Sequence, residues 1–250
     1  MIRFRTTALL AATAAAIALA RPPRAVAQPE TARVAVFAAA SLAAPFRGIA
    51  DRFERSHPGT RVDLNFAGSP TLVRQIVEGG RADVFASADE ANMQKLVDAN
   101  AVADRPRVFA RNRLTMLVEE GNPKKIASLA DLARPGLTIA LAAPGVPVGA
   151  YARAAFAKAG VPVPPSSEEV DVRAVLQKVV LGEADAGIVY ATDAVGGTAV
   201  AIPDSQNVIA RYPIAVLREA PSRELGLAFV QLALSPEGRQ ILERAGFLAP

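Results

Sequence analysis

The sequence has no cysteine, no tryptophan and a single histidine, His57, among its 250 residues. Without cysteine the chain needs no disulfide in an oxidising compartment, and it offers no cluster of cysteine and histidine at metal-ligand spacing. A Ser-His-Asp triad would have to use His57, which precedes Pro58-Gly59 in a predicted turn, and no Gly-x-Ser-x-Gly motif accompanies it. These absences weigh against a disulfide-stabilised scaffold, a zinc site and a serine hydrolase.

Net positive charge is absent from most of the chain. The formal net charge is +4, and residues 1–27 contain four arginines and no acidic residue. The remainder is therefore electrically neutral overall. A nucleic-acid partner would require a basic face, so we expect none.

The first 27 residues have the pattern of a secretory signal peptide. Arg3 and Arg5 precede an apolar stretch over residues 8–20, and Ala25-Val26-Ala27 is a small-x-small cleavage site. We expect export to the periplasm and cleavage before Gln28. Because no cysteine follows, the exported protein is not expected to be a lipoprotein. No later apolar run reaches the roughly 18 residues of a membrane span, so we expect it to be soluble.

Strand patterns alternate with helix patterns along the rest of the chain, which predicts an α/β fold with a mostly parallel sheet. Ser69 is expected to cap one helix, with Pro70 at its first position, and Asp171 to cap another. The predicted strands are 33–39, 61–67, 83–86, 113–119, 137–141, 186–190, 199–202 and 208–217. The predicted helices are 45–55, 69–79, 87–99, 128–132, 150–159, 171–181, 223–234 and 236–245.

Ligands of such sheets bind beyond the carboxyl ends of the strands, against helix N-termini whose N–H groups are unpaired. Five residues lie just beyond a predicted strand or at a predicted helix start: Ser41, Ser69, Val148, Val172 and Tyr190. Each is a candidate for binding an anion. Their alternative roles are ordinary ones, namely helix caps for the serines and core packing for the other three.

Six segments, taken in order, resemble the periplasmic molybdate-binding proteins of ABC-type uptake systems. They are Phe37-Ala38-Ala39-Ala40-Ser41-Leu42, Phe66-Ala67-Gly68-Ser69-Pro70-Thr71-Leu72, Ala82-Asp83-Val84-Phe85-Ala86-Ser87-Ala88, Pro147-Val148-Gly149-Ala150-Tyr151-Ala152, Asp171-Val172-Arg173 and Gly187-Ile188-Val189-Tyr190. The resemblance implies a two-lobed type II periplasmic binding protein fold, with two crossover strands and the ligand in the cleft between the lobes. Lobe I would comprise residues 28–112 and 214–250, and lobe II residues 113–213. By analogy, residues 108–119 and 208–217 would contain the crossings.

The same resemblance implies how the ligand is held. Ser41 and Ser69 would donate from one lobe, Val148 and Val172 would donate backbone N–H groups from the other, and Tyr190 would donate its phenol. These residues would bind the oxygens of a molybdate or tungstate ion without touching the metal and without a cationic side chain. A membrane permease would be the partner of a monomeric, non-catalytic protein that needs no cofactor. Tyr212, on the second predicted crossover, is expected to have no ligand role.

Two departures from the family pattern bear on the size of the cavity. Val148 stands where alanine is common, and Gly68 and Pro70 flank Ser69 where serines are common. A pocket made only of donors suits an unprotonated dianion, because the O–H of hydrogen phosphate would lack an acceptor at a cost of about 1–3 kcal/mol. Sulfate is also unprotonated, so cavity size alone would reject it. Two kinds of function remain as alternatives to molybdate binding. One is a binding protein for sulfate, phosphate, ferric ion or an organic anion, and the other is a secreted α/β hydrolase.

Overall fold

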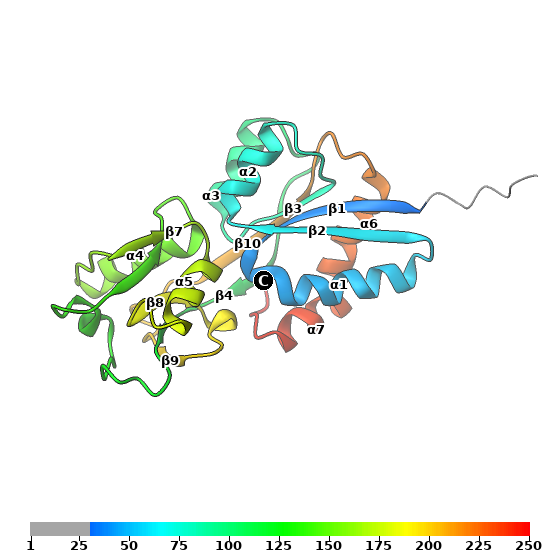
Figure 1. The fold of residues 1–250 in the computed structure, drawn as a ribbon. Helices are drawn as coiled ribbons and strands as arrows, with labels where there is room; N and C mark the ends of the chain where they lie inside the picture. Colours follow the sequence, from blue (N-terminus) through cyan, green and yellow to red (C-terminus); the bar gives the residue numbers. More distant parts are fainter. Residues whose placement is uncertain (1–30) are drawn as a thin grey trace, which may run out of the picture. The chain divides into compact units, whose positions relative to one another are not determined.

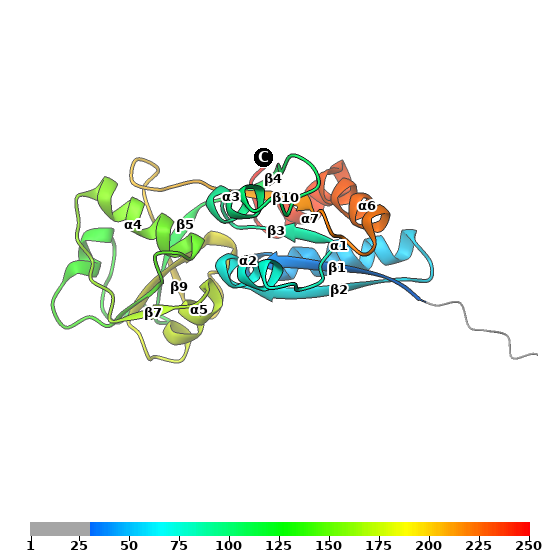
Figure 2. The same cartoon turned by 90° about the horizontal axis from the view of Figure 1, so that it is seen from above.

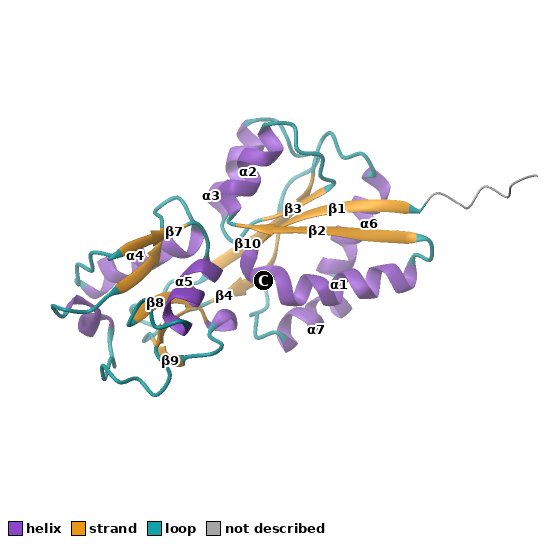
Figure 3. Cartoon of the chain, viewed as in Figure 1, coloured by secondary structure: helices purple, strands orange, loops and turns teal. Residues whose placement is uncertain are grey.

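The computed structural model describes residues 31–250, which form one compact unit. The expected signal peptide and its cleavage site lie outside the described residues. The described chain builds two five-stranded sheets with helices packed on them (Figures 1 and 3). Its fold is thus mixed α/β, as predicted. No helix within residues 31–250 has both the length and the apolar character needed to cross a membrane.

The first sheet has the strand order β2-β1-β3-β10-β4. Its strands are β1 (Ala32–Ala39), β2 (Thr60–Ala67), β3 (Val84–Ala86), β4 (Arg107–Asn112) and β10 (Ala210–Val216). The helices that pack on it are α1 (Ala43–Ser56), α2 (Ser69–Val77), α3 (Glu90–Asp98), α6 (Arg223–Leu234) and α7 (Pro236–Arg244). We call these elements, with the short 3-10 helix η1 (Ala40–Leu42), lobe I.

The second sheet has the strand order β7-β6-β8-β5-β9. Its strands are β5 (Leu114–Val118), β6 (Ile139–Ala142), β7 (Ser167–Glu169), β8 (Ala186–Tyr190) and β9 (Thr198–Ala201). The helices α4 (Pro147–Ala159) and α5 (Val172–Val180) pack on it. With the 3-10 helices η2 (Leu129–Ala133) and η3 (Ala191–Asp193), they form lobe II.

The first sheet has apolar side chains on both faces, which explains why helices pack on each face. On one face, Phe46 and Phe53 of α1 meet Phe229 of α6 with ring centroids 5.9 and 5.6 Å apart. On the other face, Phe85 packs with the buried side chains of α2 and α3, two helices that lie side by side (Figure 2). The alternation along β3 is that of a strand buried on both sides.

Each sheet is mixed, which corrects the prediction of a mostly parallel sheet. In the first sheet β1 pairs in parallel with β2 and β3, while β10 pairs antiparallel with β3 and β4. In the second sheet β6 pairs in parallel with β7 and β8, while β5 pairs antiparallel with β8 and β9. In the first sheet the antiparallel strand is β10, which returns from the second sheet, and in the second sheet it is β5, the first strand to arrive from the first sheet.

The chain passes between the lobes twice. One passage is the single residue Arg113 between β4 and β5, within the predicted crossing 108–119. The other is the segment 202–209, because β10 belongs to the first sheet along its whole length. The chain thus returns to lobe I four residues earlier than the predicted boundary at 214. Asn207 joins the passages: its Oδ1 accepts from the N–H of Leu114 at 3.1 Å, and its Nδ2 donates to the Leu114 carbonyl at 2.9 Å.

Candidate functional site

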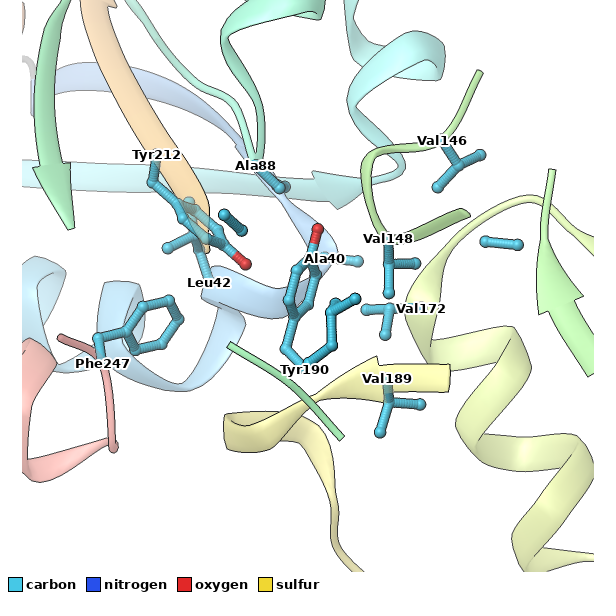
Figure 4. Packing of buried hydrophobic residues seen from close by; sticks show 14 of the residues in the cluster. Ala40, Leu42, Ala88, Val146, Val148, Val172, Val189, Tyr190, Tyr212 and Phe247 are labelled. Atoms are coloured by element: carbon cyan, nitrogen blue, oxygen red, sulfur yellow. The ribbon is translucent and has the colours of Figure 1, made fainter. Parts of the chain in front are cut away.

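A buried pocket lies where the two lobes meet. Its lining comes from lobe I through Ala39, Ala40, Gly68, Ser69 and Ala88, and from lobe II through Val146, Pro147, Val148, Asp171, Val172 and Tyr190. Four of the five predicted ligand residues are among them. Figure 4 shows Tyr190 beside Ala40, Val148 and Val172. The structure therefore brings together segments that are distant in the sequence.

The register of the first sheet explains the lobe I side of the pocket. The parallel strands β1 and β2 pair Ala39 with Ala67, and β1 pairs Ala38 with Ala86 of β3. Three strands therefore end at the same edge. The residues that follow them, including Ala40 and Ser69, are delivered to one place, as the carboxyl ends of parallel strands require.

Two helix N-termini form much of the lobe II side. Val148 is the second residue of α4 and Val172 the first residue of α5, and both side chains are nearly fully buried. N–H groups in the first turn of a helix have no carbonyl partner within that helix. The helix α4 begins three residues earlier than predicted, so Val148 lies within it. Gly149 permits this start, because a Cβ there would collide with the carbonyl oxygens of Ala142 and Ala143.

Asp171 is the one charged residue among the lining residues, and its carboxylate is hydrogen-bonded within the protein. As predicted, it caps α5, with its Oδ1 accepting from the N–H of Ala174 at 3.0 Å. Arg173 follows in the same helix, but its guanidinium lies over the ring of Phe66, 5.7 Å from the centroid, and it does not line the pocket. The pocket thus has no cationic side chain in its lining.

The hydroxyl of Tyr190 is a buried polar group without a hydrogen-bond partner among the described residues. Its side chain closes the end of β8 and is 1% exposed. Burial, followed by the neighbouring Tyr212, raises the pKa of this phenol well above its ordinary value. The group is therefore a neutral O–H that can donate. A buried donor left unpaired costs about 1–3 kcal/mol, which a ligand acceptor would recover.

Ser69 is held in the pocket by a bond that leaves its hydroxyl hydrogen available. The Oγ of Ser69 accepts from the N–H of Ala88 at 3.1 Å. It makes no capping bond, because the helix is capped at Gly68 and Ser69 is already its first residue. The prediction of Ser69 as the N-cap is therefore wrong. As the first residue of the helix, Ser69 lines the pocket with its hydroxyl. The oxygen already accepts from Ala88, and the hydrogen can be donated to a ligand.

Ser41 lies outside the lining of this pocket. It is buried in η1, and its Oγ is 3.1 Å from the hydroxyl oxygen of Tyr212. It lines a neighbouring cavity that also lies between the lobes, together with Arg173 and Asp193. Its expected contact with the ligand stays a prediction.

Tyr212 is the residue near the site that the sequence did not indicate. It is fully buried in β10, and its ring meets that of Tyr190 edge to face at 5.7 Å between centroids. Its hydroxyl is the partner of Ser41. The sequence placed it on a predicted crossover and without a ligand role; in the structure it lies within β10, whose register shifts between Tyr212 and Pro213.

Little space separates the two lobes at the pocket. The volume open to the centre of a water-sized sphere is about 10 Å³, close to the minimum that holds one water. An ion admitted here would therefore contact both lobes at once. Within residues 31–250, no group of three or more His, Cys, Asp or Glu side chains is placed to hold a metal ion.

The family model for bacterial extracellular solute-binding proteins matches residues 34–248. The molybdate-binding protein ModA of Mycobacterium tuberculosis is 42% identical over 221 residues, which cover 87% of this chain and 85% of that protein. ModA of Escherichia coli is 33% identical over 229 residues, covering 86% and 88%.

Solved structures of the same fold include the periplasmic molybdate-binding protein of Azotobacter vinelandii, with a TM-score of 0.77, 20% identity and coverage of 87% of this chain and 99% of that one. The sulfate-binding protein SubI of Mycobacterium tuberculosis has a TM-score of 0.78, 20% identity and 86% coverage of both chains. At these identities the likeness concerns the fold. With two mixed sheets, two passages between lobes and a pocket where they meet, the chain belongs to the bacterial extracellular solute-binding protein family.

Proposed function

We propose that this protein captures molybdate, or the equally tetrahedral tungstate, outside the cytoplasm and delivers it to the permease of an ABC transporter. The observation that carries the proposal is the Tyr190 hydroxyl, a buried donor without a protein partner at a pocket shared by both lobes. The relatives named molybdate-binding proteins, at up to 42% identity over most of the chain, support the same ligand.

The chemistry of the lining supports a fully deprotonated oxyanion. Tyr190 and Ser69 can donate hydroxyl hydrogens, and the first turns of α4 and α5 offer unpaired N–H groups near Val148 and Val172. Hydrogen bonds to an ionised acceptor contribute about 1.5–3 kcal/mol each. Because these are net values after exchange with water, four or five such bonds can hold a dianion without any cationic side chain.

Ser41 completes the proposed set of donors from lobe I. Its hydroxyl and that of Tyr212 can exchange donor and acceptor roles, so Ser41 can turn its hydrogen toward a ligand while Tyr212 donates to it. In this proposal the five residues Ser41, Ser69, Val148, Val172 and Tyr190 bind oxygens of the ion and none contacts the metal.

The cellular setting follows from the first residues of the chain. The predicted signal peptide ending at Ala27, with no cysteine after it, supports export to the periplasm without a lipid anchor. We propose that the exported protein acts as a monomer. Its partner in transport is the membrane permease, which would receive the ion when the lobes separate.

The test is thermal unfolding of the purified protein with molybdate, tungstate, sulfate or phosphate at equal concentration. We expect molybdate and tungstate to raise the melting temperature, because a ligand at 100 times its dissociation constant adds about 2.7 kcal/mol to the free energy of unfolding. Sulfate and phosphate should raise it much less. Equal shifts with sulfate and molybdate would contradict the assignment of the ligand and leave the fold untouched.

A further inference from the structure

Gly68 lies at a contact between the two lobes, and its backbone conformation does not explain why it is a glycine. It precedes α2 with φ −58° and ψ 139°, angles that any residue adopts. A Cβ built on it would collide with the carbonyl oxygen of Val170, and would lie 3.5 Å from the Cβ of Asp171. The obstacle therefore belongs to the other lobe.

Neither side of this contact can yield easily. On the lobe II side, Val170 stands between two anchored neighbours: the Glu169 carbonyl accepts from the N–H of Ala143 at 2.9 Å, and Asp171 is tied to α5 by its cap. On the lobe I side, the Gly68 carbonyl accepts from the N–H groups of Thr71 and Leu72 at 2.9 and 3.1 Å. A side chain at Gly68 would thus meet a backbone oxygen that is fixed in place.

The two segments in contact are those that carry site residues. Gly68 directly precedes Ser69, and Val170 stands two residues before Val172. The distance between Gly68 and the Val170 carbonyl therefore limits how near the donors of one lobe approach those of the other. Because the pocket is narrow, moving one lobe by about the length of a carbon–carbon bond changes which oxygens of an ion the donors of both lobes can contact.

We propose that Gly68 is a positioning residue that sets the depth of lobe closure, so that any side chain there holds the lobes apart and weakens the grip on the anion. This role rests on the proposed oxyanion binding, in which donors of both lobes contact the ion together. Gly68 itself donates nothing to the ligand; it acts by leaving room for Val170.

The first measurement is calorimetric titration of molybdate into Gly68→Ala, with Gly145→Ala as the matched control. Gly145 lies in the loop before α4, is exposed, and a Cβ there meets no atom within 4 Å. We expect Gly68→Ala to bind at least tenfold more weakly, chiefly through faster dissociation in stopped flow, with an unchanged melting temperature in the absence of anion. Gly145→Ala should bind like the parent.

The second measurement follows closure itself and does not depend on the identity of the anion. Because the chain has no cysteine, spin labels can be placed on Val77→Cys of α2 and Leu181→Cys after α5, positions that are 60% and 71% exposed. We expect the shortest separations in the distance distribution of the parent to be missing in Gly68→Ala, with and without molybdate.

The outcomes separate the two proposals. Equal molybdate affinity, or identical distance distributions in the parent and Gly68→Ala, would overturn the role of Gly68. A parent that fails to bind molybdate, while its shortest separations still vanish in Gly68→Ala, would overturn the proposed ligand and support the role of Gly68.

Discussion

Tyr190 and Tyr212 face each other across the two lobes, yet their hydroxyls differ. The hydroxyl of Tyr212 has Ser41 as a partner, whereas that of Tyr190 has none among the described residues. Burial raises the pKa of both phenols well above the ordinary value, so both remain protonated. Removing the hydroxyl of Tyr190 should therefore weaken ligand binding directly. Removing that of Tyr212 should act through Ser41.

Replacing Tyr190 with phenylalanine should weaken molybdate binding by about ten- to a hundredfold. The ring and its packing against Tyr212 are kept, so folding should survive, and one donor to an ionised acceptor is lost at about 1.5–3 kcal/mol. Calorimetric titration measures the affinity. Tyr151→Phe is the matched control, since Tyr151 lies in α4 outside the pocket lining. An affinity equal to that of the parent would make Tyr190 a structural residue.

Replacing Tyr212 with phenylalanine should weaken binding by a smaller amount, about two- to tenfold. The change removes the neighbour that orients the Ser41 hydroxyl, and a neutral hydrogen bond contributes about 0.5–1.5 kcal/mol. A double-mutant cycle with Ser41→Ala identifies the route. If Tyr212 acts through Ser41, its replacement costs nothing further in the Ser41→Ala background; an undiminished loss there would refute that route.

The sequence could predict the residues of the pocket but not their contacts. Ser69, Val148, Val172 and Tyr190 were found because strand ends and helix starts are visible in a single sequence. Tyr212 was not, because β10 comes from the far end of the chain and its neighbours are set by sheet order. The pairing of Ser41 with Tyr212 joins residues 171 positions apart, which no local pattern encodes.

Among the secondary-structure elements, those with a strong apolar period or a clear cap were predicted well. The strand β8 and the helix α6 have the predicted bounds, and Asp171 caps α5 as expected. The strand β7 was missed because Ser167–Glu169 is polar and carries no strand signal. The helix α3 begins at Glu90, later than predicted, because Asp89 is its cap and accepts from the N–H of Asn92.

Replacing Asp171 with alanine should destabilise the start of α5. Loss of the bond to the Ala174 N–H should lower the free energy of unfolding by about 0.5–2 kcal/mol, measured by urea denaturation. Because Val172 begins this helix, molybdate affinity should fall as well. Asp171→Asn keeps a capping oxygen and removes the charge, so it should retain most of the stability. If Asp171→Ala is as stable as the parent, the cap contributes nothing measurable.

At the scale of the whole molecule, the contact between the lobes contains a half-buried aspartate, Asp193, one of whose carboxylate oxygens is buried. Oδ2 of Asp193 has no partner among the described residues, and the residue lines the cavity next to the pocket with Ser41 and Arg173. Burial raises the pKa of this carboxyl from 3.8 to about 7, with Arg173 opposing and Asp171 adding to the shift. Between about pH 4 and pH 7, the carboxyl group of Asp193 therefore stays protonated in the folded protein but is ionised in the unfolded chain.

The contribution of Asp193 to stability should be greatest below about pH 4 and should fall as the pH rises toward 7. Between those values the folded state binds more protons than the unfolded state, so the slope is negative, by at most about 1.4 kcal/mol per pH unit. Melting temperatures of the parent and Asp193→Asn from pH 4 to pH 8 measure it. The variant should lose less stability over this range and be the more stable of the two at pH 8. Parallel curves would mean that Asp193 ionises normally in the folded protein.

The two passages between the lobes are bonded to each other by Asn207 and by Arg113, whose guanidinium donates to the carboxylate of Asp204 at 3.1 Å. Asn207 binds both backbone groups of Leu114, and beside it Asn112 of β4 pairs with Ala210 of β10. Connections joined in this way permit rotation about one axis and resist sliding of one lobe across the other. When one lobe rotates against the other, the rim of the pocket farthest from the two joined passages moves the greatest distance. For the proposed ligand, we therefore expect entry and release by that rim.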